Sequence, residues 1–293
     1  MPHIVVEYSA NLESDVAPQR LVDALHAAAL ATGGLVASFF HLGHPERAWR
    51  AATQWRTSWL SREVIVLPGF IALALAYAAA EAAGRAELAL ALGALAALAA
   101  LALFLCTGMI YACIRFLREW ATPLTPLNFL LLGCANGLTL ASALAAAAAP
   151  ALLPFFAVGA IALTLIGLAG RMAAWRRNAA LAPKSTLQTA IGIKHPRIEQ
   201  RAQGFMGGSF NTREFFHGRS AATLRVLRIL AAVGAFALPI ALLALGGFGW
   251  ASFGAALLLA AAAALQYLGL LAERWLFFAE ARHPQNLYYQ RMA

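Results

Sequence analysis

The chain has 293 residues, of which 61% are hydrophobic and 12% are charged. Soluble domains are about one quarter charged, so the composition excludes an ordinary soluble protein and favours one embedded in membrane lipid. The formal net charge of +9 does not indicate a nucleic-acid partner, because the basic residues lie in loops between apolar runs.

The N-terminal part predicts a short strand–helix segment. Residues 3–9 are strand-like and residues 16–31 are helical. Residues 24–43 carry no charge, so this helix can continue toward the membrane. We therefore treat residues 22–42 as a candidate transmembrane span.

Residues 41–63 hold the densest mixture of His, Arg, Glu and Trp in the chain. Tryptophan and arginine gather where a chain leaves hydrocarbon for lipid headgroups and water. At such a boundary, His41 and Glu63 can exchange protons with a lipid-soluble partner. Two structural interpretations remain open, namely a hydrogen-bonded interfacial histidine and a glutamate that caps a helix beginning at Val64.

Six long apolar stretches follow, and each is close to the roughly 20 residues that a helix needs to cross the hydrocarbon. A soluble Ala-rich helical protein would need a polar face on each helix, which these stretches lack. The sequence predicts an all-α fold, a polytopic membrane helical bundle with six transmembrane helices and the candidate seventh. The predicted spans are residues 64–82, 88–114, 127–149, 152–172, 226–245 and 250–272.

The basic residues predict the orientation. Arginines are abundant in residues 41–63, in the long loop 173–225 and in the C-terminal tail, whereas the opposite loops offer only Arg85. The positive-inside rule places the arginine-rich side in the cytoplasm. We expect a multi-pass protein of the bacterial inner membrane.

The predicted spans exclude several kinds of chemistry. A membrane cytochrome b needs paired histidines within its helices, and the six spans contain none, so we expect no haem. The cysteines have no C-x-x-C spacing, so we expect no metal in this chain. The mild polar residues Asn136, Thr139 and Ser142 share a helix face and predict hydrogen bonds between helices.

A quinone site remains the best candidate. It requires hydrogen-bond partners for two oxygens and a residue that accepts or delivers protons. His41 and Glu63 suit these roles. Tyr111 and Arg115, predicted on one helix face at the same membrane side, form a weaker candidate pair.

The long loop is too patterned for a simple connector. Residues 204–218 place Phe and Met beside Arg, which indicates a docking surface for a partner protein. A solvated connector is the alternative. The Gly-Lys-Ser/Thr ending of a phosphate-binding loop is absent.

The chain from about residue 34 resembles the membrane anchor subunit of the dimethyl sulfoxide reductase type of molybdopterin oxidoreductase. The segments that carry this resemblance are residues 41–45 (His-Leu-Gly-His-Pro), 59–63 (Trp-Leu-Ser-Arg-Glu), 123–129 (Pro-Leu-Thr-Pro-Leu-Asn-Phe), 205–218 and 274–278 (Arg-Trp-Leu-Phe-Phe).

The resemblance implies a haem-free anchor in anaerobic electron transport. It would exchange electrons between the quinone or menaquinol pool and an iron–sulfur subunit that connects to a molybdopterin catalytic subunit. It also implies that His41 and Glu63 are quinol-site residues. Related anchors serve reductases of sulfoxide-like substrates and sulfite-oxidising complexes.

Residues 1–9 (Met-Pro-His-Ile-Val-Val-Glu-Tyr-Ser) and 21–25 (Leu-Val-Asp-Ala-Leu) instead resemble the start of 5-carboxymethyl-2-hydroxymuconate isomerase, a tautomerase. This resemblance implies that Pro2 would be the general base. We therefore divide the chain into a truncated tautomerase-like segment, 1–33, and a membrane anchor domain, 34–293. The anchor family that the chain resembles has eight spans, so we expect this chain to be a fusion or a truncation. The alternative function is a truncated isomerase fused to a membrane segment.

Overall fold

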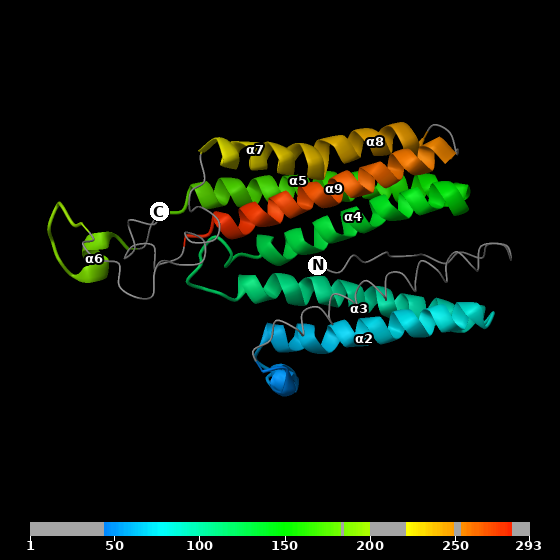
Figure 1. The fold of residues 1–293 in the computed structure, drawn as a ribbon, viewed down its shortest axis with the longest axis horizontal. Helices are drawn as coiled ribbons and strands as arrows, with labels where there is room; N and C mark the ends of the chain where they lie inside the picture. Colours follow the sequence, from blue (N-terminus) through cyan, green and yellow to red (C-terminus); the bar gives the residue numbers. More distant parts are fainter. Residues whose placement is uncertain (1–43, 183–184, 200–220, 249–252, 283–293) are drawn as a thin grey trace.

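The computed structural model describes residues 44–182, 185–199, 221–248 and 253–282. Across these ranges the chain forms helices and no strand (Figure 1). The elements are the 3-10 helix η1 (Pro45–Ala52), α2 (Trp59–Ala82), α3 (Ala86–Ala112), α4 (Leu124–Ala148), the 3-10 turn η2 (Pro150–Leu152), α5 (Leu153–Ala179), α6 (Leu187–Ile191), α7 (Ala221–Ala232), the π-helix η4 (Val233–Ala237), α8 (Leu238–Gly247) and α9 (Phe253–Ala279).

Six helical segments are long and apolar enough to cross a membrane. They are α2, α3, α4, α5 with η2, the continuous α7–η4–α8, and α9. This confirms the predicted polytopic helical bundle with six spans. The candidate span 22–42 and the strand–helix segment in residues 1–33 lie outside the described residues.

The helices extend beyond several predicted limits. Helices α5 and α9 continue well past the C-terminal ends of the predicted spans 152–172 and 250–272. A helix can extend beyond the membrane, so the limits of these spans stay predictions. Helix α5 also includes the first residues of the predicted loop 173–225. The charged side chains Arg171, Glu273 and Arg274 do not end these helices, since they are buried and paired with one another.

The start of α2 also differs from the prediction. The helix begins at Trp59, and the Ser58 hydroxyl caps it by accepting a hydrogen bond from the Ser61 N–H at 3.3 Å. Glu63 consequently lies in the second turn. The interpretation of Glu63 as the cap of a helix beginning at Val64 is wrong.

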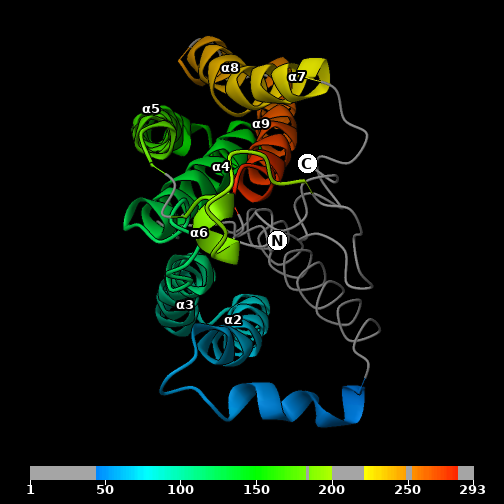
Figure 2. The ribbon, with the colours of Figure 1, turned by 90° about the vertical axis from the view of Figure 1, so that its left-hand side faces the viewer.

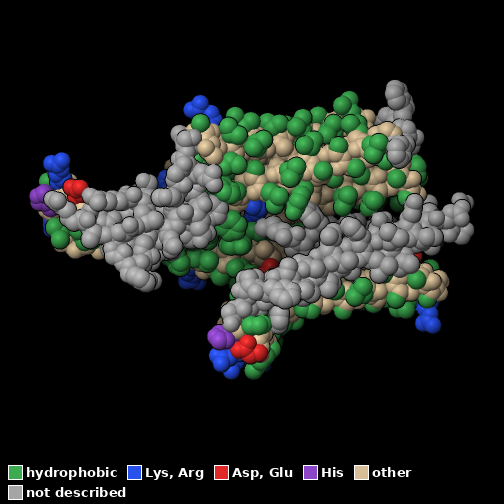
Figure 3. All heavy atoms as spheres, viewed as in Figure 1, with side chains coloured by type: hydrophobic (Ala, Val, Ile, Leu, Met, Phe, Trp, Pro, Cys, Tyr) green, Lys and Arg blue, Asp and Glu red, His purple; other side chains and the backbone are tan. Residues whose placement is uncertain are grey.

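Helix α4 is the centre of the bundle. It packs against α3, α5 and α9, while α2 packs mainly against α3. Figure 2 shows the α2–α3 pair on one side of α4, with α5, α7 and α8 on the other. Hydrophobic side chains cover the flanks of the helices, and Lys and Arg gather mostly near the ends (Figure 3).

One end of the bundle carries most of the arginines, and we call it the basic end. It is the end at which α2 and α4 begin and α3, α5 and α9 finish. The arginines in the segments beyond these helix ends include Arg56, Arg115, Arg118, Arg197 and Arg282. The opposite end, as far as it is described, carries Arg85 near Glu81 and Glu87.

A buried amide joins the helices in the middle of the bundle. Gln266 of α9 accepts hydrogen bonds from Thr139 at 2.7 Å and from Asn136 at 3.4 Å, both on α4. It donates to Thr164 of α5 at 3.0 Å. This confirms the predicted hydrogen bonding between helices for Asn136 and Thr139, whereas Ser142 donates to a carbonyl of its own helix at 2.8 Å.

The π-helix η4 is explained by its neighbours. Pro239 has no N–H to donate to the carbonyl four residues earlier, that of Ala235. Gln266 donates to this carbonyl at 3.3 Å. A methyl group added at Gly234 would lie 3.2 Å from the Gly269 Cα, so the two glycines allow close approach of η4 and α9.

Candidate functional site

The Glu63 carboxylate faces α3 from the second turn of α2. It is half-buried, and Oε1 accepts a hydrogen bond from the Thr107 hydroxyl. That hydroxyl also lies 3.0 Å from the Leu103 carbonyl oxygen. A hydroxyl has one proton but two acceptor lone pairs. A protonated Glu63 can therefore donate to Thr107 while Thr107 donates to Leu103, so Glu63 keeps its partner when it gains or loses a proton.

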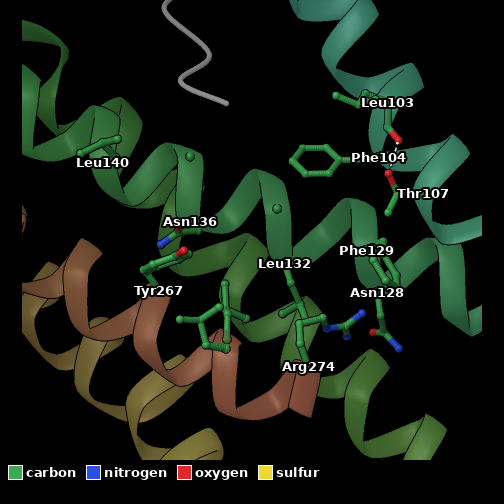
Figure 4. A pocket seen from close by; sticks show the side chains of 14 residues that line it. Leu103, Phe104, Thr107, Asn128, Phe129, Leu132, Asn136, Leu140, Tyr267 and Arg274 are labelled. Atoms are coloured by element: carbon green, nitrogen blue, oxygen red, sulfur yellow. Dashed lines mark hydrogen bonds between the residues drawn. The ribbon is translucent and has the colours of Figure 1, made fainter. Parts of the chain in front are cut away.

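Thr107 lines a pocket between α3, α4 and α9 (Figure 4). The pocket has a volume of about 100 Å³ and a mostly apolar wall. Its lining residues recur at helical spacing, so each helix contributes one stripe. These stripes are Leu103, Phe104 and Thr107 of α3; Asn128, Phe129, Leu132, Gly133, Asn136, Gly137 and Leu140 of α4; and Tyr267, Leu270, Leu271 and Arg274 of α9.

Four polar residues around this pocket lie at the same depth. Glu63, Thr107, Asn128 and Arg274 are each within about five residues of a helix terminus at the basic end, which corresponds to about 7.5 Å of helix. The rest of the pocket, toward Leu140, extends into the middle of the bundle, where Asn136 and Tyr267 are its polar lining residues. Asn136 is already hydrogen-bonded to Gln266. The charged groups therefore lie at the end near the membrane surface, and the other end is less polar.

A buried ion triad adjoins the polar end. Arg171 Nε lies 2.6 Å from Glu273 Oε1, an ion-pair contact that lacks the alignment of a hydrogen bond. Arg274 Nε donates to Glu273 Oε2 at 2.5 Å. The Glu273 side chain is fully buried. Two guanidinium groups share one carboxylate, so the triad retains one net positive charge.

Arg274 is the member of the triad that lines the pocket. Its guanidinium lies over the rings of Phe129 at 4.2 Å and Phe277 at 4.8 Å, an arrangement that stabilises a cation. Nη1 of Arg274 is buried without a hydrogen-bond partner. Figure 4 shows this guanidinium and the Asn128 amide at the same end of the pocket.

Asn128 is 2% exposed and joins α4 to α5. Its Nδ2 donates to the Gly170 carbonyl at 3.3 Å, and its Oδ1 has no hydrogen-bond partner. A methyl group at Gly170 would lie 2.7 Å from this Oδ1. A glycine is therefore needed for the approach of the two helices.

Tyr111 and Arg115 are not brought together. Helix α3 ends at Ala112, so the predicted shared helix face does not exist, and Arg115 is exposed in the following turn. Tyr111 packs in an aromatic cluster, stacked on Phe129 with ring centroids 5.7 Å apart. The other rings of this cluster are Trp120, Phe277 and Phe278. Tyr111 supports the pocket wall from behind and does not line it.

His41 lies outside the described residues, so its proximity to Glu63 stays a prediction. The described part of the 41–63 motif carries guanidinium groups over neighbouring indole rings. The pairs are Arg50 with Trp49 at 5.6 Å, Arg56 with Trp55 at 5.4 Å and Arg62 with Trp59 at 4.1 Å. Within the described ranges, no group of three or more His, Cys, Asp or Glu side chains could hold a metal ion.

Sequence reasoning did not place Asn128, Glu273 and Arg274 in the site. A hydropathy pattern ends the apolar run before the charged residues Glu273 and Arg274. It also does not distinguish Asn128 from a polar residue that only joins two helices. A usable signal was present on α9. Gln266 and Glu273 are seven residues apart, and so are Tyr267 and Arg274. Positions separated by seven residues share a helix face, so this spacing predicts a polar stripe that faces the bundle.

Comparison with known proteins agrees with this architecture. The family described as "DMSO reductase anchor subunit (DmsC)" matches residues 12–263. The chain is 54% identical over 284 residues to a sulfite dehydrogenase subunit from Allochromatium vinosum, covering 93% of this chain and 86% of that protein. No solved structure matches the chain.

The comparisons give no support to the tautomerase resemblance of residues 1–33. The family match already begins at residue 12, within that segment. The family match covers most of the chain, and the identity to the sulfite dehydrogenase protein is high, so both findings show to which family the chain belongs. The chain belongs to the DMSO reductase anchor subunit family.

Proposed function

We propose that this chain is the membrane anchor of a molybdopterin oxidoreductase complex and exchanges electrons between quinone and an iron–sulfur partner subunit. Family membership and the six spans support the anchor role. The observation that carries the quinone site is the Glu63–Thr107 hydrogen bond beside a pocket that is otherwise mostly apolar.

The pocket suits an amphiphile with a small polar head and a long apolar tail. Its α4 stripe runs from Asn128 to Leu140, which corresponds to about 18 Å along the helix axis. A quinone head would lie at the polar end, with its tail directed toward the middle of the membrane. Ligand pockets of this kind combine apolar walls with a few polar groups that fix orientation.

Glu63 supplies the proton chemistry. Reduction of quinone to quinol consumes two electrons and two protons. Glu63 delivers one proton to a quinone oxygen, either directly or through the Thr107 hydroxyl. It then takes up another proton from the solution at the basic end. The resemblance assigns His41 a matching role in proton exchange. Menaquinone or another membrane quinone is the substrate, and the chain itself needs neither haem nor metal.

The sulfite dehydrogenase relative supports one direction of electron flow over the other. We propose that the complex oxidises sulfite at the molybdopterin subunit and that the iron–sulfur subunit delivers the electrons to quinone here. The bacterial inner membrane is the expected location, with the basic end in the cytoplasm. In a sulfoxide-reducing complex, electrons would flow through the same site in the opposite direction, from quinol to the iron–sulfur subunit.

The experiment uses the assembled complex in membranes and measures sulfite-dependent reduction of a short-chain naphthoquinone. Glu63→Gln should lower turnover by about a hundredfold, the usual contribution of a positioned proton donor. Glu81→Gln, the same substitution at the other end of α2, is the matched control and should leave turnover unchanged. Unchanged turnover in Glu63→Gln, with all subunits still co-purifying, would overturn the proposed site.

The partner subunits are expected to dock on the basic end. A second cavity of about 620 Å³ opens there between α5, α7 and α9. Its rim carries Arg225 and Arg282, and also Arg228 paired with Glu280 at 3.1 Å. A crosslinker attached to the exposed Cys113 should reach the iron–sulfur subunit. A cysteine placed at Ala83, at the opposite end, is the control and should not.

A further inference from the structure

The pocket has a second polar wall that the Glu63–Thr107 chemistry does not use. Thr107 lines the pocket from α3, and Arg274 lines it from α9. A quinone head carries two oxygens on opposite sides of its ring. A pocket with polar groups contributed by two different helices can bind both of them.

The charge at Arg274 is poorly compensated. Glu273 accepts from Arg274 and also contacts Arg171, so one carboxylate serves two guanidinium groups. The other described acidic groups near the triad are Glu63 of α2, which is hydrogen-bonded to Thr107, and Glu280, which pairs with Arg228. A buried cation that lacks a full partner is costly, and it favours a ligand that carries or develops negative charge.

We infer that Arg274 binds the second oxygen of the quinone head and stabilises the semiquinone anion formed by transfer of the first electron. This inference rests on the proposed function, because it requires a quinone in this pocket. The iron–sulfur cluster of the partner subunit gives one electron, and the quinone becomes a radical anion. A second electron and two protons complete the quinol, and one of the protons comes from Glu63.

An anionic phospholipid shares part of this chemistry, since it also has a charged head and an apolar tail. The opposite wall disfavours it. The Glu63 carboxylate, when ionised, would repel a phosphate but can donate a proton to a quinone oxygen when protonated. Phe104 and Phe129, which line the pocket, also provide flat surfaces for a planar ring.

The test is a redox titration of the assembled complex in lipid vesicles with menaquinone, in which electron paramagnetic resonance measures the semiquinone. Arg274→Gln should lower the semiquinone stability constant by roughly tenfold to hundredfold, as expected for loss of a nearby charge. Arg274→Lys, which keeps the charge, should restore most of it. Arg171→Gln removes the other partner of Glu273 and separates charge from contact, because Arg274 is then fully compensated but still lines the pocket. It should lower the constant by clearly less than Arg274→Gln does, since the hydrogen-bond donor beside the quinone oxygen is kept.

The possible failures are distinguishable. If menaquinone does not bind to the wild-type complex, the proposed function fails as well. If it binds and the wild type forms no semiquinone, or if Arg274→Gln and Arg171→Gln lower the constant equally, the role of Arg274 is overturned and the quinone site stands. If cardiolipin added to phosphatidylcholine vesicles displaces menaquinone from the wild type but not from Arg274→Gln, the pocket is a lipid site and the inference is wrong.

Discussion

The buried ion triad provides the sharpest test of the packing. Glu273→Gln removes the carboxylate that Arg171 and Arg274 share, while the side chain keeps nearly the same size and shape. Both contacts are short, with Nε–O distances of 2.6 Å to Arg171 and 2.5 Å to Arg274. The Glu273 side chain is fully buried, so water cannot replace the lost partner.

The magnitude follows from the charges that remain. Removing one partner of a buried ion pair costs about 3–5 kcal/mol, because the other charge stays buried and uncompensated. Glu273→Gln leaves two such guanidinium groups, one on α5 and one on α9. We therefore expect a loss of about 4 kcal/mol, close to a thousandfold in the unfolding equilibrium.

The assay is the free energy of unfolding of the chain in mixed lipid–detergent micelles, titrated with a denaturing detergent. Glu280→Gln is the matched control, because Glu280 directly follows α9 and pairs with Arg228 at a partly exposed position. Such pairs contribute at most about 1 kcal/mol. If Glu273→Gln costs no more than Glu280→Gln, the triad does not hold α9 against α5 and the reasoning fails.

Three further outcomes are expected. Gln266→Leu should lower the free energy of unfolding by about 2 kcal/mol, since hydrogen bonds between membrane helices are individually modest; no change in unfolding would contradict this. A methyl group at Gly269 would collide with the Ala235 nitrogen, so Gly269→Ala should cost about 3 kcal/mol. Gly69→Ala, which meets nothing within 4 Å, should stay within about 1 kcal/mol of the wild type on the same unfolding scale. A membrane-impermeant maleimide should label the exposed Cys113 in inverted vesicles and not in spheroplasts; the reverse pattern would refute the predicted orientation.

The six spans could be predicted because a helix that crosses the hydrocarbon of a membrane needs a long run of apolar residues. In this chain such runs are separated by charged or Gly/Pro-rich segments. Apolarity predicts the run 226–245 as one span, and this run is continuous in the structure. Its π-helix could not be located from apolarity, because the irregular turn depends on Pro239 and on the contacts of η4 with α9.

The ends of α5 and α9 could not be predicted from apolarity alone. A hydropathy argument treats an arginine as a residue that faces water, but Arg171 and Arg274 face Glu273 inside the bundle. Which residues face each other depends on how α5, α4 and α9 pack, and that is a tertiary property. The helical spacing of polar residues indicates the interior face without identifying the partner across it.

The same limit applies to the functional site, as two polar residues of α9 illustrate. Gln266 and Arg274 are both polar residues in an apolar helix, so hydropathy does not distinguish their roles. In the structure the two side chains differ in how many of their hydrogen-bonding groups have partners. Each end of the Gln266 amide makes two hydrogen bonds within the bundle, and it has no capacity left for a ligand. Arg274 shares its carboxylate with a second arginine and keeps an unbonded donor beside the pocket. Buried polar groups are nearly always satisfied, so an incompletely satisfied group on a pocket wall is the one to expect at a binding site.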